Sequence, residues 1–277
     1  MINIYKDEIK KSLNQLRLKL IFPDILFFIV SLLLLGMFTR ITGLANIAPE
    51  ALETGLESYV AANFGSLVGS LFVFVLVAFF IGAGLKAFKL KMIIEAMKGK
   101  EFNMWKAFQD SHKFYWRVIG LKILSLVILL IGFVAAIIIY LLLRNLFEVL
   151  AMVLAVLLLI YIVLALLLKE AALFQKNLNA ADAIKNSFKT FSKNRMLVFG
   201  LLVIVLIVNF AAAILEGLFP ESTGAMGIII STVFLLIVLL ISAWGNLFTF
   251  NVYQRITKKT PRKIKRAKKK TTKRRKK

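Results

Sequence analysis

The sequence predicts an all-α fold: a polytopic helical membrane protein with six transmembrane helices. Of its 277 residues, 60% are apolar, more than the roughly 45–50% that is usual in soluble domains. The apolar residues gather in blocks of about 20, the length of helix that crosses a hydrocarbon core about 30 Å thick. Lys and Arg concentrate in alternate segments between these blocks, a pattern typical of multi-pass proteins.

The hydropathy pattern places the six spans, and one of their boundaries needs a separate argument. The predicted spans are at about 21–39, 64–85, 118–143, 149–168, 196–215 and 225–250. The apolar run 118–168 is interrupted only at 144–148, where Arg144, Asn145 and Glu148 lie. A single helix over that run would be more than twice as long as the hydrocarbon core is thick. The chain must therefore turn back at 144–148, which predicts a tight hairpin.

The distribution of basic residues predicts the orientation of the spans. Four segments hold nearly all the Lys and Arg: 1–20, 86–117, 169–195 and 251–277. The three intervening loops have only Arg40 and Arg144 as basic residues, and they lie at 40–63, 144–148 and 216–224. Because basic loops stay on the cytoplasmic side, both termini are expected in the cytoplasm of a cell-membrane protein. An odd number of spans would break this alternation.

A weak internal repeat precedes each pair of spans. With a shift of 76 residues, Asn103 and Ser111 align with Asn179 and Ser187, and a shorter copy at the N-terminus contains Ser12. The number of copies equals the number of predicted hairpins. The repeat therefore predicts three hairpin units, each preceded by an amphipathic cytoplasmic helix.

Apolar side chains at helical spacing support these three amphipathic helices. The stripes are Ile9, Leu13, Leu16 and Leu20; Trp105, Phe108, His112 and Tyr115; and Ile184, Phe188 and Phe191. Asn103 and Asn179 occupy the N-cap position of the second and third helices. Such helices either lie in the headgroup plane or pack against neighbouring spans, and both readings keep them at the cytoplasmic face.

The C-terminal segment 255–277 is strongly basic, with 15 Lys or Arg in 23 residues and no acid. Such a segment cannot bury a core, so we expect a disordered tail that follows a six-helix transmembrane domain at 1–254. Anionic lipid headgroups are the favoured partner, and RNA or the ribosome is the alternative. The expected contacts are Arg262, Lys263, Lys265, Arg266, Lys268, Lys269, Lys270, Lys273, Arg274, Arg275, Lys276 and Lys277.

Within the spans, Asn209 is the candidate polar contact. An interhelical hydrogen bond is the favoured role, and contact with a substrate is the alternative. Asp24, Lys122, Glu148 and Lys169 fall near predicted span ends, where long side chains reach the interface.

Sequence features of enzymes and of metal or cofactor sites are missing. The chain has one histidine and no cysteine, which disfavours a metal centre. The sequence contains no Gly-x-Ser-x-Gly, His-Glu-x-x-His or phosphate-binding Gly-Lys motif. We therefore expect a protein that is not an enzyme and has no cofactor.

The three-unit pattern resembles a broad group of six-span prokaryotic membrane proteins of unknown role. One branch of that group is similar to the membrane domain fused to some glycerophosphodiester phosphodiesterases. The resemblance rests on segments 9–23, 103–120 and 179–200, with serines at matched positions. The phosphodiesterase barrel of those fusions has no counterpart in this sequence. The resemblance implies a membrane module and carries over no catalytic residue.

Together these features lead to three hypotheses about function. The first is a non-enzymatic membrane protein that engages the anionic cytoplasmic leaflet through its interfacial helices and polybasic tail. The second is a small-molecule or lipid transporter with a pathway near Asn209. The third is a membrane tether for RNA or ribosomes through the tail.

Overall fold

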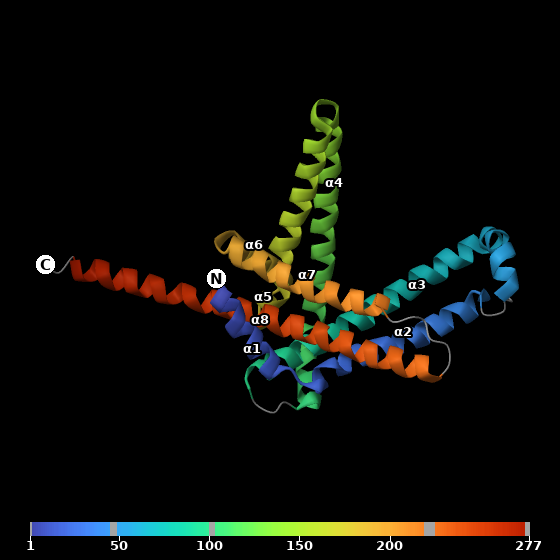
Figure 1. Cartoon of the computed structure of the whole chain (residues 1–277), viewed down its shortest axis with the longest axis horizontal. Helices are drawn as coiled ribbons and strands as arrows, with labels where there is room; N and C mark the ends of the chain where they lie inside the picture. The colour runs from blue at the N-terminus through green and yellow to red at the C-terminus, as the bar shows by residue number, and fades with distance from the viewer. Residues whose placement is uncertain (1, 45–48, 100–102, 219–224, 275–277) are drawn as a thin grey trace.

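The computed structural model describes residues 2–44, 49–99, 103–218 and 225–274, and all regular secondary structure in these ranges is helical (Figure 1). In chain order the elements are α1 (Ile2–Gln15), the 3₁₀ helix η1 (Leu18–Ile21), α2 (Phe22–Ile41), α3 (Pro49–Met97), α4 (Met104–Leu166), α5 (Lys169–Lys176), α6 (Ala180–Lys193), α7 (Arg195–Leu218) and α8 (Ala225–Arg274). The all-α prediction is confirmed for these residues.

Five of the described helical segments are long and apolar enough to cross a membrane. They are Leu18–Ile41, Tyr59–Met97, Met104–Asn145, Phe147–Lys176 and Ile229–Lys258. A bent pair, Ala180–Lys193 and Arg195–Ala211, with an angle of 105° between its helices, makes a sixth if it counts as one span. The described part of the chain is therefore a multi-pass membrane protein with five or six candidate spans.

The helices extend beyond the apolar spans predicted within them. Helix α3 begins at Pro49 and ends at Met97, whereas the predicted span covers 64–85. The flanking sequence is rich in Glu, Ala and Lys, which are good helix formers. Hydropathy detects only the part of a helix that lies in hydrocarbon, so it underestimates helices that continue into water.

The predicted turn between the third and fourth spans is present in α4. The backbone of Phe147 is not helical (φ −152°, ψ 80°) and separates two helical halves. The two halves run side by side in Figure 1, and a Cβ built on Gly132 of the first half would meet Ile162 of the second. The break lies within the predicted segment 144–148.

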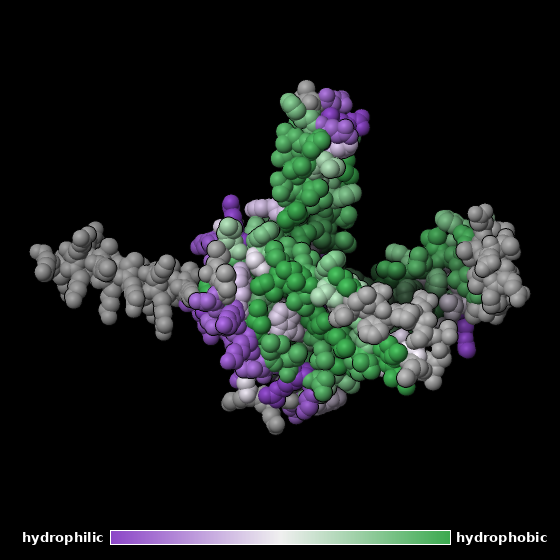
Figure 2. Space-filling model, viewed as in Figure 1, coloured by the Kyte–Doolittle hydropathy of each residue, from purple (hydrophilic) through white to green (hydrophobic). Residues whose placement is uncertain are grey.

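The helical pairs diverge from a common base. In Figure 1 the two halves of α4 rise as one arm, while α2 with α3 and α7 with α8 extend in other directions. We call the region where α1, α5, α6 and the adjoining ends of α2, α3, α4, α7 and α8 meet the base. Figure 2 shows that the α4 arm is apolar along its length, with polar residues at its tip and around the base.

The packed core lies in the base and not along the arms. Leu20, Leu90, Leu173, Phe248 and Tyr253 are among the largest side chains that are fully buried. By contrast, large apolar side chains along the arms are exposed, as an arm surrounded by lipid requires. The base therefore fixes the relative positions of the helix ends around it.

The helix starts predicted from the repeat are confirmed. The Asn103 side chain accepts hydrogen bonds from the backbone N–H groups of Trp105 and Lys106, and Asn179 accepts one from Asp182. These contacts satisfy N–H groups that have no partner within the helix. Helix α4 begins directly after Asn103 and runs unbroken through the predicted third span, so the second repeat copy is not a separate helix.

The repeated serines are buried in all three copies, whereas the apolar stripes behave differently from one copy to the next. Ser12, Ser111 and Ser187 are buried. In the second stripe Trp105 is 66% exposed and stacks on Phe108, whose ring contacts Phe88 of α3. Phe191 is buried, which matches the packing reading of the third stripe.

Helix α1 is attached to the base by polar contacts at both of its ends. Arg255 of α8 forms ion pairs with Asp7 (3.2 Å) and Glu8 (3.0 Å). Asn251 donates to the hydroxyl of Ser12 at 3.0 Å. Tyr5 donates to the carbonyl of Leu197 in α7 at 2.6 Å, and burial raises the pKa of its hydroxyl, which therefore stays a donor at neutral pH.

The basic segment, which the sequence predicts as a disordered tail, continues helix α8 in the part of the chain that the structure describes. Helix α8 continues to Arg274, and the last three residues of the chain lie outside the described ranges. Once a helix has nucleated, each further residue costs little, and Lys and Arg have good helix propensity. The order of residues 255–277 in solution stays a prediction.

Candidate functional site

Three adjoining cavities lie among the helix ends of the base and the adjoining parts of the arms. The amide cavity has a volume of about 410 Å³ and is lined by Lys169, Glu170, Asn209, Asn246 and Thr249, among others. The aspartate cavity, about 550 Å³, is lined by Asp24, Lys86, Lys89 and Lys122. The lysine cavity, about 250 Å³, is lined by Lys86, Lys122, Lys169 and Glu170.

The three cavities share lining residues and together form what we call the chamber. Ser242 and Asn246 of α8 line both the amide and the aspartate cavities. Lys169 and Glu170 of α5 line both the amide and the lysine cavities. Because α2, α3, α4, α5, α7 and α8 all contribute, only the assembled base creates the chamber.

Two carboxylates in the chamber are paired with lysines of α3. Lys89 Nζ lies 2.6 Å from Asp24 Oδ2, and these side chains are only 8% and 24% exposed. Lys89 also donates to the hydroxyl of Ser242 at 3.1 Å. Lys86 Nζ lies 2.5 Å from Glu170 Oε1. Each pair joins α3 to another element, and each neutralises one positive charge.

Two further lysines in the chamber form no ion pair with the described residues. Lys122 and Lys169 are half-buried, and Lys122 Nζ lies 5.2 Å from the centre of the Phe79 ring. Four lysines therefore face two carboxylates, which leaves an excess of two positive charges. A half-buried cation without a counter-ion of its own is unfavourable, and the nearby Glu170 is already paired with Lys86. The chamber is thus suited to bind an anion.

Apolar side chains continue the walls of the chamber along the arms. Leu126 and Leu129 of α4 line the lysine cavity, and Leu129, Val163 and Val205 line the amide cavity. Leu126 is 57% exposed and Val163 is 43% exposed. The chamber therefore places cations beside surfaces that can contact hydrocarbon chains, and this combination fits an amphiphilic anion.

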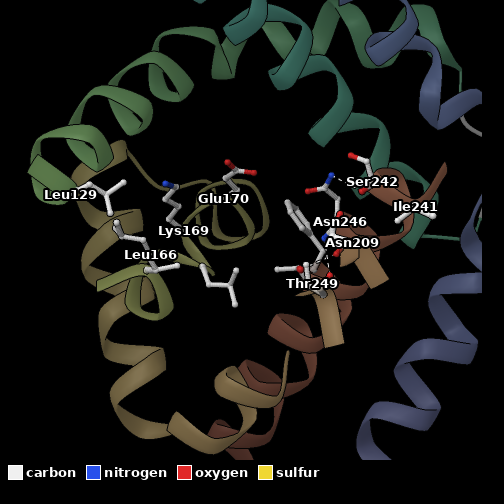
Figure 3. A pocket seen from close by; sticks show the side chains of 14 residues that line it. Leu129, Leu166, Lys169, Glu170, Asn209, Ile241, Ser242, Asn246 and Thr249 are labelled. Carbon is white, nitrogen blue, oxygen red and sulfur yellow. Dashed lines mark hydrogen bonds between the residues drawn. The ribbon is translucent and has the colours of Figure 1, made fainter. Parts of the chain in front are cut away.

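Asn209 lies in the amide cavity, opposite the charged residues of α5. In Figure 3, Lys169 and Glu170 lie on one side of the cavity, and Asn209, Ser242, Asn246 and Thr249 lie on the other. The Asn209 amide donates to the carbonyl of Val205 in its own helix at 2.7 Å. The favoured interhelical hydrogen bond is therefore not the contact observed in the described residues, and the role of Asn209 stays a prediction.

The structure separates the other residues that the sequence singled out. Asp24, Lys122 and Lys169 come together in the chamber. Glu148 is exposed next to the turn of α4, at the far end of that arm. The side chains of the twelve tail residues, from Arg262 to Lys277, lie outside the described part of the structure. The predicted lipid or RNA contacts of the tail stay predictions.

The sequence did not predict that the charged residues at the span ends come together in one chamber. Asp24, Lys122 and Lys169 each suit a separate span end, and Lys86, Lys89 and Glu170 appear as ordinary loop charges. One sequence feature could have indicated the chamber. The basic ends of the second, third and fourth predicted spans each carry a lysine within about four residues of the predicted boundary, and boundaries are uncertain by about that amount.

Comparison with protein-family models, with curated proteins and with solved structures finds no match for this chain. Among the described residues, no group of three or more His, Cys, Asp or Glu side chains could hold a metal ion.

Proposed function

We propose that this chain is a non-enzymatic membrane protein that binds an anionic lipid of the cytoplasmic leaflet, with the lipid phosphate in the chamber. The observation that carries the proposal is the excess of two positive charges at Lys122 and Lys169, half-buried beside apolar walls. A lipid phosphodiester carries one negative charge, which offsets one of these two charges and is shared between the two lysines. Its acyl chains extend along Leu126 and Leu129, away from the base.

The proposed topology has six spans, with the base at the cytoplasmic face. In support, the base collects the segments that carry the Lys and Arg residues, and such segments stay in the cytoplasm. The α6–α7 pair then counts as the fifth span with its preceding interfacial helix, which completes three hairpin units. This topology puts the chamber at the level of the cytoplasmic headgroups.

The amphipathic segments and the tail have supporting roles in this proposal. The exposed rings of Trp105 (66%) and Phe108 (41%) suit the interface between headgroups and hydrocarbon. The basic residues of 255–277 attract anionic lipids toward the base, each by about 1 kcal/mol. The tail raises the local concentration of the ligand, and the chamber binds it.

The direct test is lipid binding by the purified full-length chain, measured by native mass spectrometry in detergent. Phosphatidylglycerol and phosphatidylcholine are titrated separately. The double variant Lys122→Gln/Lys169→Gln removes both unpaired charges and keeps the side chains polar. Loss of two charge-assisted hydrogen bonds predicts at least roughly tenfold weaker binding of phosphatidylglycerol. Binding of phosphatidylcholine changes little, because it has no net charge.

A matched control keeps the change in net charge equal. Lys19 and Lys185 are exposed and do not line the chamber, so Lys19→Gln/Lys185→Gln reports the effect of net charge alone. The affinity of this control for phosphatidylglycerol is expected to be within about twofold of that of the parent chain, because exposed surface charges contribute little to binding energy. Equal losses in the two double variants would reject the chamber as the binding site.

A lipid or small-molecule transporter is the second candidate, favoured by the position of Asn209. This residue is within a predicted span and lines the amide cavity together with residues at the base. A polar path from the base into a span is what a transported headgroup needs. Reconstituted vesicles test it through the rate at which a fluorescent phosphatidylglycerol moves between leaflets. If phosphatidylglycerol moves between the leaflets no faster than in protein-free vesicles, the chain binds lipid but does not transport it.

A further inference from the structure

The chamber is divided into a cationic part and an uncharged polar part. The lysine cavity has three lysines and one carboxylate in its wall. The amide cavity has one lysine and one carboxylate, together with Ser242, Asn246, Asn209 and Thr249. Lys169 and Glu170 line both, so the two parts adjoin. A ligand that fills both must carry a negative charge next to an uncharged polar group.

The polar side chains of the amide cavity already use hydrogen-bond donors within their own helices. Asn209 donates to Val205 (2.7 Å), and Asn246 donates to Ser242 (2.9 Å). The Thr249 hydroxyl donates to Gly245 at 2.8 Å. A backbone carbonyl can only accept, so these contacts fix which atom of each side chain is the donor. Each amide keeps its oxygen and one further N–H for a ligand, and the hydroxyl keeps its lone pairs, which suits a ligand group that both donates and accepts.

Two kinds of lipid headgroup donate hydrogen bonds: ammonium groups and hydroxyl groups. An ammonium group adds a positive charge, and the carboxylate that lines this cavity, Glu170, is already paired with Lys86 at 2.5 Å. It would also lie beside Lys169, which repels it. Hydroxyl groups carry no charge and can donate to amide oxygens without that penalty. The cavity therefore favours a hydroxylated group over an amine.

We propose that the ligand is a lipid whose phosphodiester is followed by a polyhydroxylated headgroup, such as glycerol, inositol or a sugar. This inference rests on the proposed function and adds the class of headgroup. The phosphate occupies the lysine cavity between Lys122 and Lys169. The hydroxyl groups occupy the amide cavity and donate to Asn209, Asn246 and Thr249. Figure 3 shows that Asn246 faces Glu170 across this cavity.

The experiment compares two lipids with the same charge. Phosphatidylglycerol and phosphatidylmethanol are both phosphodiesters with one negative charge, but only the first has headgroup hydroxyls. Native mass spectrometry of the full-length chain measures the affinity of each. Two hydrogen bonds to hydroxyls predict that phosphatidylglycerol binds roughly tenfold more tightly. Phosphatidylethanolamine, which carries an ammonium group, is expected to bind more weakly than either.

Variants of the amide cavity test the assignment of residues. Asn209→Leu/Asn246→Leu removes both acceptors with little change in volume, and it is expected to bind the two phosphodiesters within about twofold of each other. Ser231→Leu is the control, because Ser231 is an exposed polar residue of α8 that does not line the chamber. This control is expected to keep the roughly tenfold preference for phosphatidylglycerol over phosphatidylmethanol.

The outcomes separate this inference from the proposed function. If Lys122→Gln/Lys169→Gln weakens both phosphodiesters but the parent chain binds them equally, the headgroup class is wrong and the chamber remains a lipid site. If that lysine variant binds both lipids as the parent does, the proposed function and this inference both fail. Free glycerol 3-phosphate is expected not to displace the lipid at equal concentration, because it has no acyl chains. Displacement would assign the chamber to a soluble phosphate and overturn the inference.

Discussion

At the scale of single residues, the polar contacts of the base are specific and few. Lys89 connects α3 to Asp24 of α2 and to Ser242 of α8. Ser187 donates to the carbonyl of Ala165 at 2.5 Å, in the last turn of α4, where carbonyls have no partner within the helix. Contacts of this kind determine where α2, α4 and α8 meet α3 and α6.

Lys89→Gln tests the ion pair with Asp24. Lys89 is almost fully buried, so the substitution leaves the Asp24 carboxylate with little solvent and no directly paired cation. We expect a loss of about 2–3 kcal/mol in the free energy of unfolding in mixed micelles, somewhat below the value for fully buried pairs because Asp24 is 24% exposed. Lys113→Gln is the control, because that side chain is 79% exposed. If Lys89→Gln lowers the free energy of unfolding no more than the control does, the ion pair with Asp24 does not stabilise the fold.

Ser187→Ala and Ser111→Ala test the same repeat position in two different contexts. Ser187 bonds to another helix, whereas Ser111 donates to Phe108 within its own helix. We expect Ser187→Ala to cost about 2 kcal/mol, because the Ala165 carbonyl loses its partner. Ser111→Ala is expected to change the stability by less than about 0.5 kcal/mol, since Ala has the better helix propensity. Equal losses of stability in the two variants, measured by unfolding in urea or mixed micelles, would contradict the assignment of an interhelical hydrogen bond to Ser187 alone.

At the scale of elements, α1 depends on α8 for its position. Arg255 pairs with Asp7 and Glu8 of α1, and Gln15 at the other end donates to the carbonyl of Met97 in α3 at 3.2 Å. A helix of 14 residues is marginal by itself in water. The contacts with the base therefore keep α1 folded.

Arg255→Gln is expected to release the N-terminal half of α1. The measurement is amide hydrogen exchange of residues 2–15, which we expect to become faster by at least about tenfold. Exchange in the α4 arm is the internal reference, because that arm makes no contact with Arg255 and should not change. Unchanged protection of α1 would mean that Tyr5 and Ser12 hold it without the ion pairs.

At the scale of the whole molecule, apolar arms project from a polar base. The arms expose apolar side chains to lipid, while the base contains the buried core and the chamber. Because no arm alone encloses the chamber, its geometry depends on how the arms are held at the base. A ligand that contacts α4, α5 and α8 together would stabilise that arrangement.

The proposed orientation can be tested with introduced cysteines, since the chain has none of its own. Asn145 is exposed beside the turn of α4, and Lys113 is exposed near the base. A membrane-impermeant maleimide is expected to label Asn145→Cys in intact cells and Lys113→Cys only after lysis. The reverse pattern would place the base, and with it the chamber, on the outer face.

The sequence was sufficient for the fold class, for the turn within α4 and for the helix starts at Asn103 and Asn179. These features depend on local hydropathy and on capping chemistry, which short segments encode. It was not sufficient for the chamber. Asp24 and Lys89, or Lys86 and Glu170, are far apart in sequence, and only the packing of the base brings them together. The amphipathic stripes show the same limit: periodicity identifies an apolar face but not what covers it.

The most direct test of the chamber as a lipid site is an electron cryo-microscopy structure of the full-length chain in phosphatidylglycerol nanodiscs, with an antibody fragment to aid alignment. We predict density for a lipid phosphate in contact with Lys122 and Lys169, with acyl chains along Leu126 and Leu129. Lipid phosphates found only at the interfacial helices and the tail, with Lys122 and Lys169 facing water, would contradict the chamber as a lipid site.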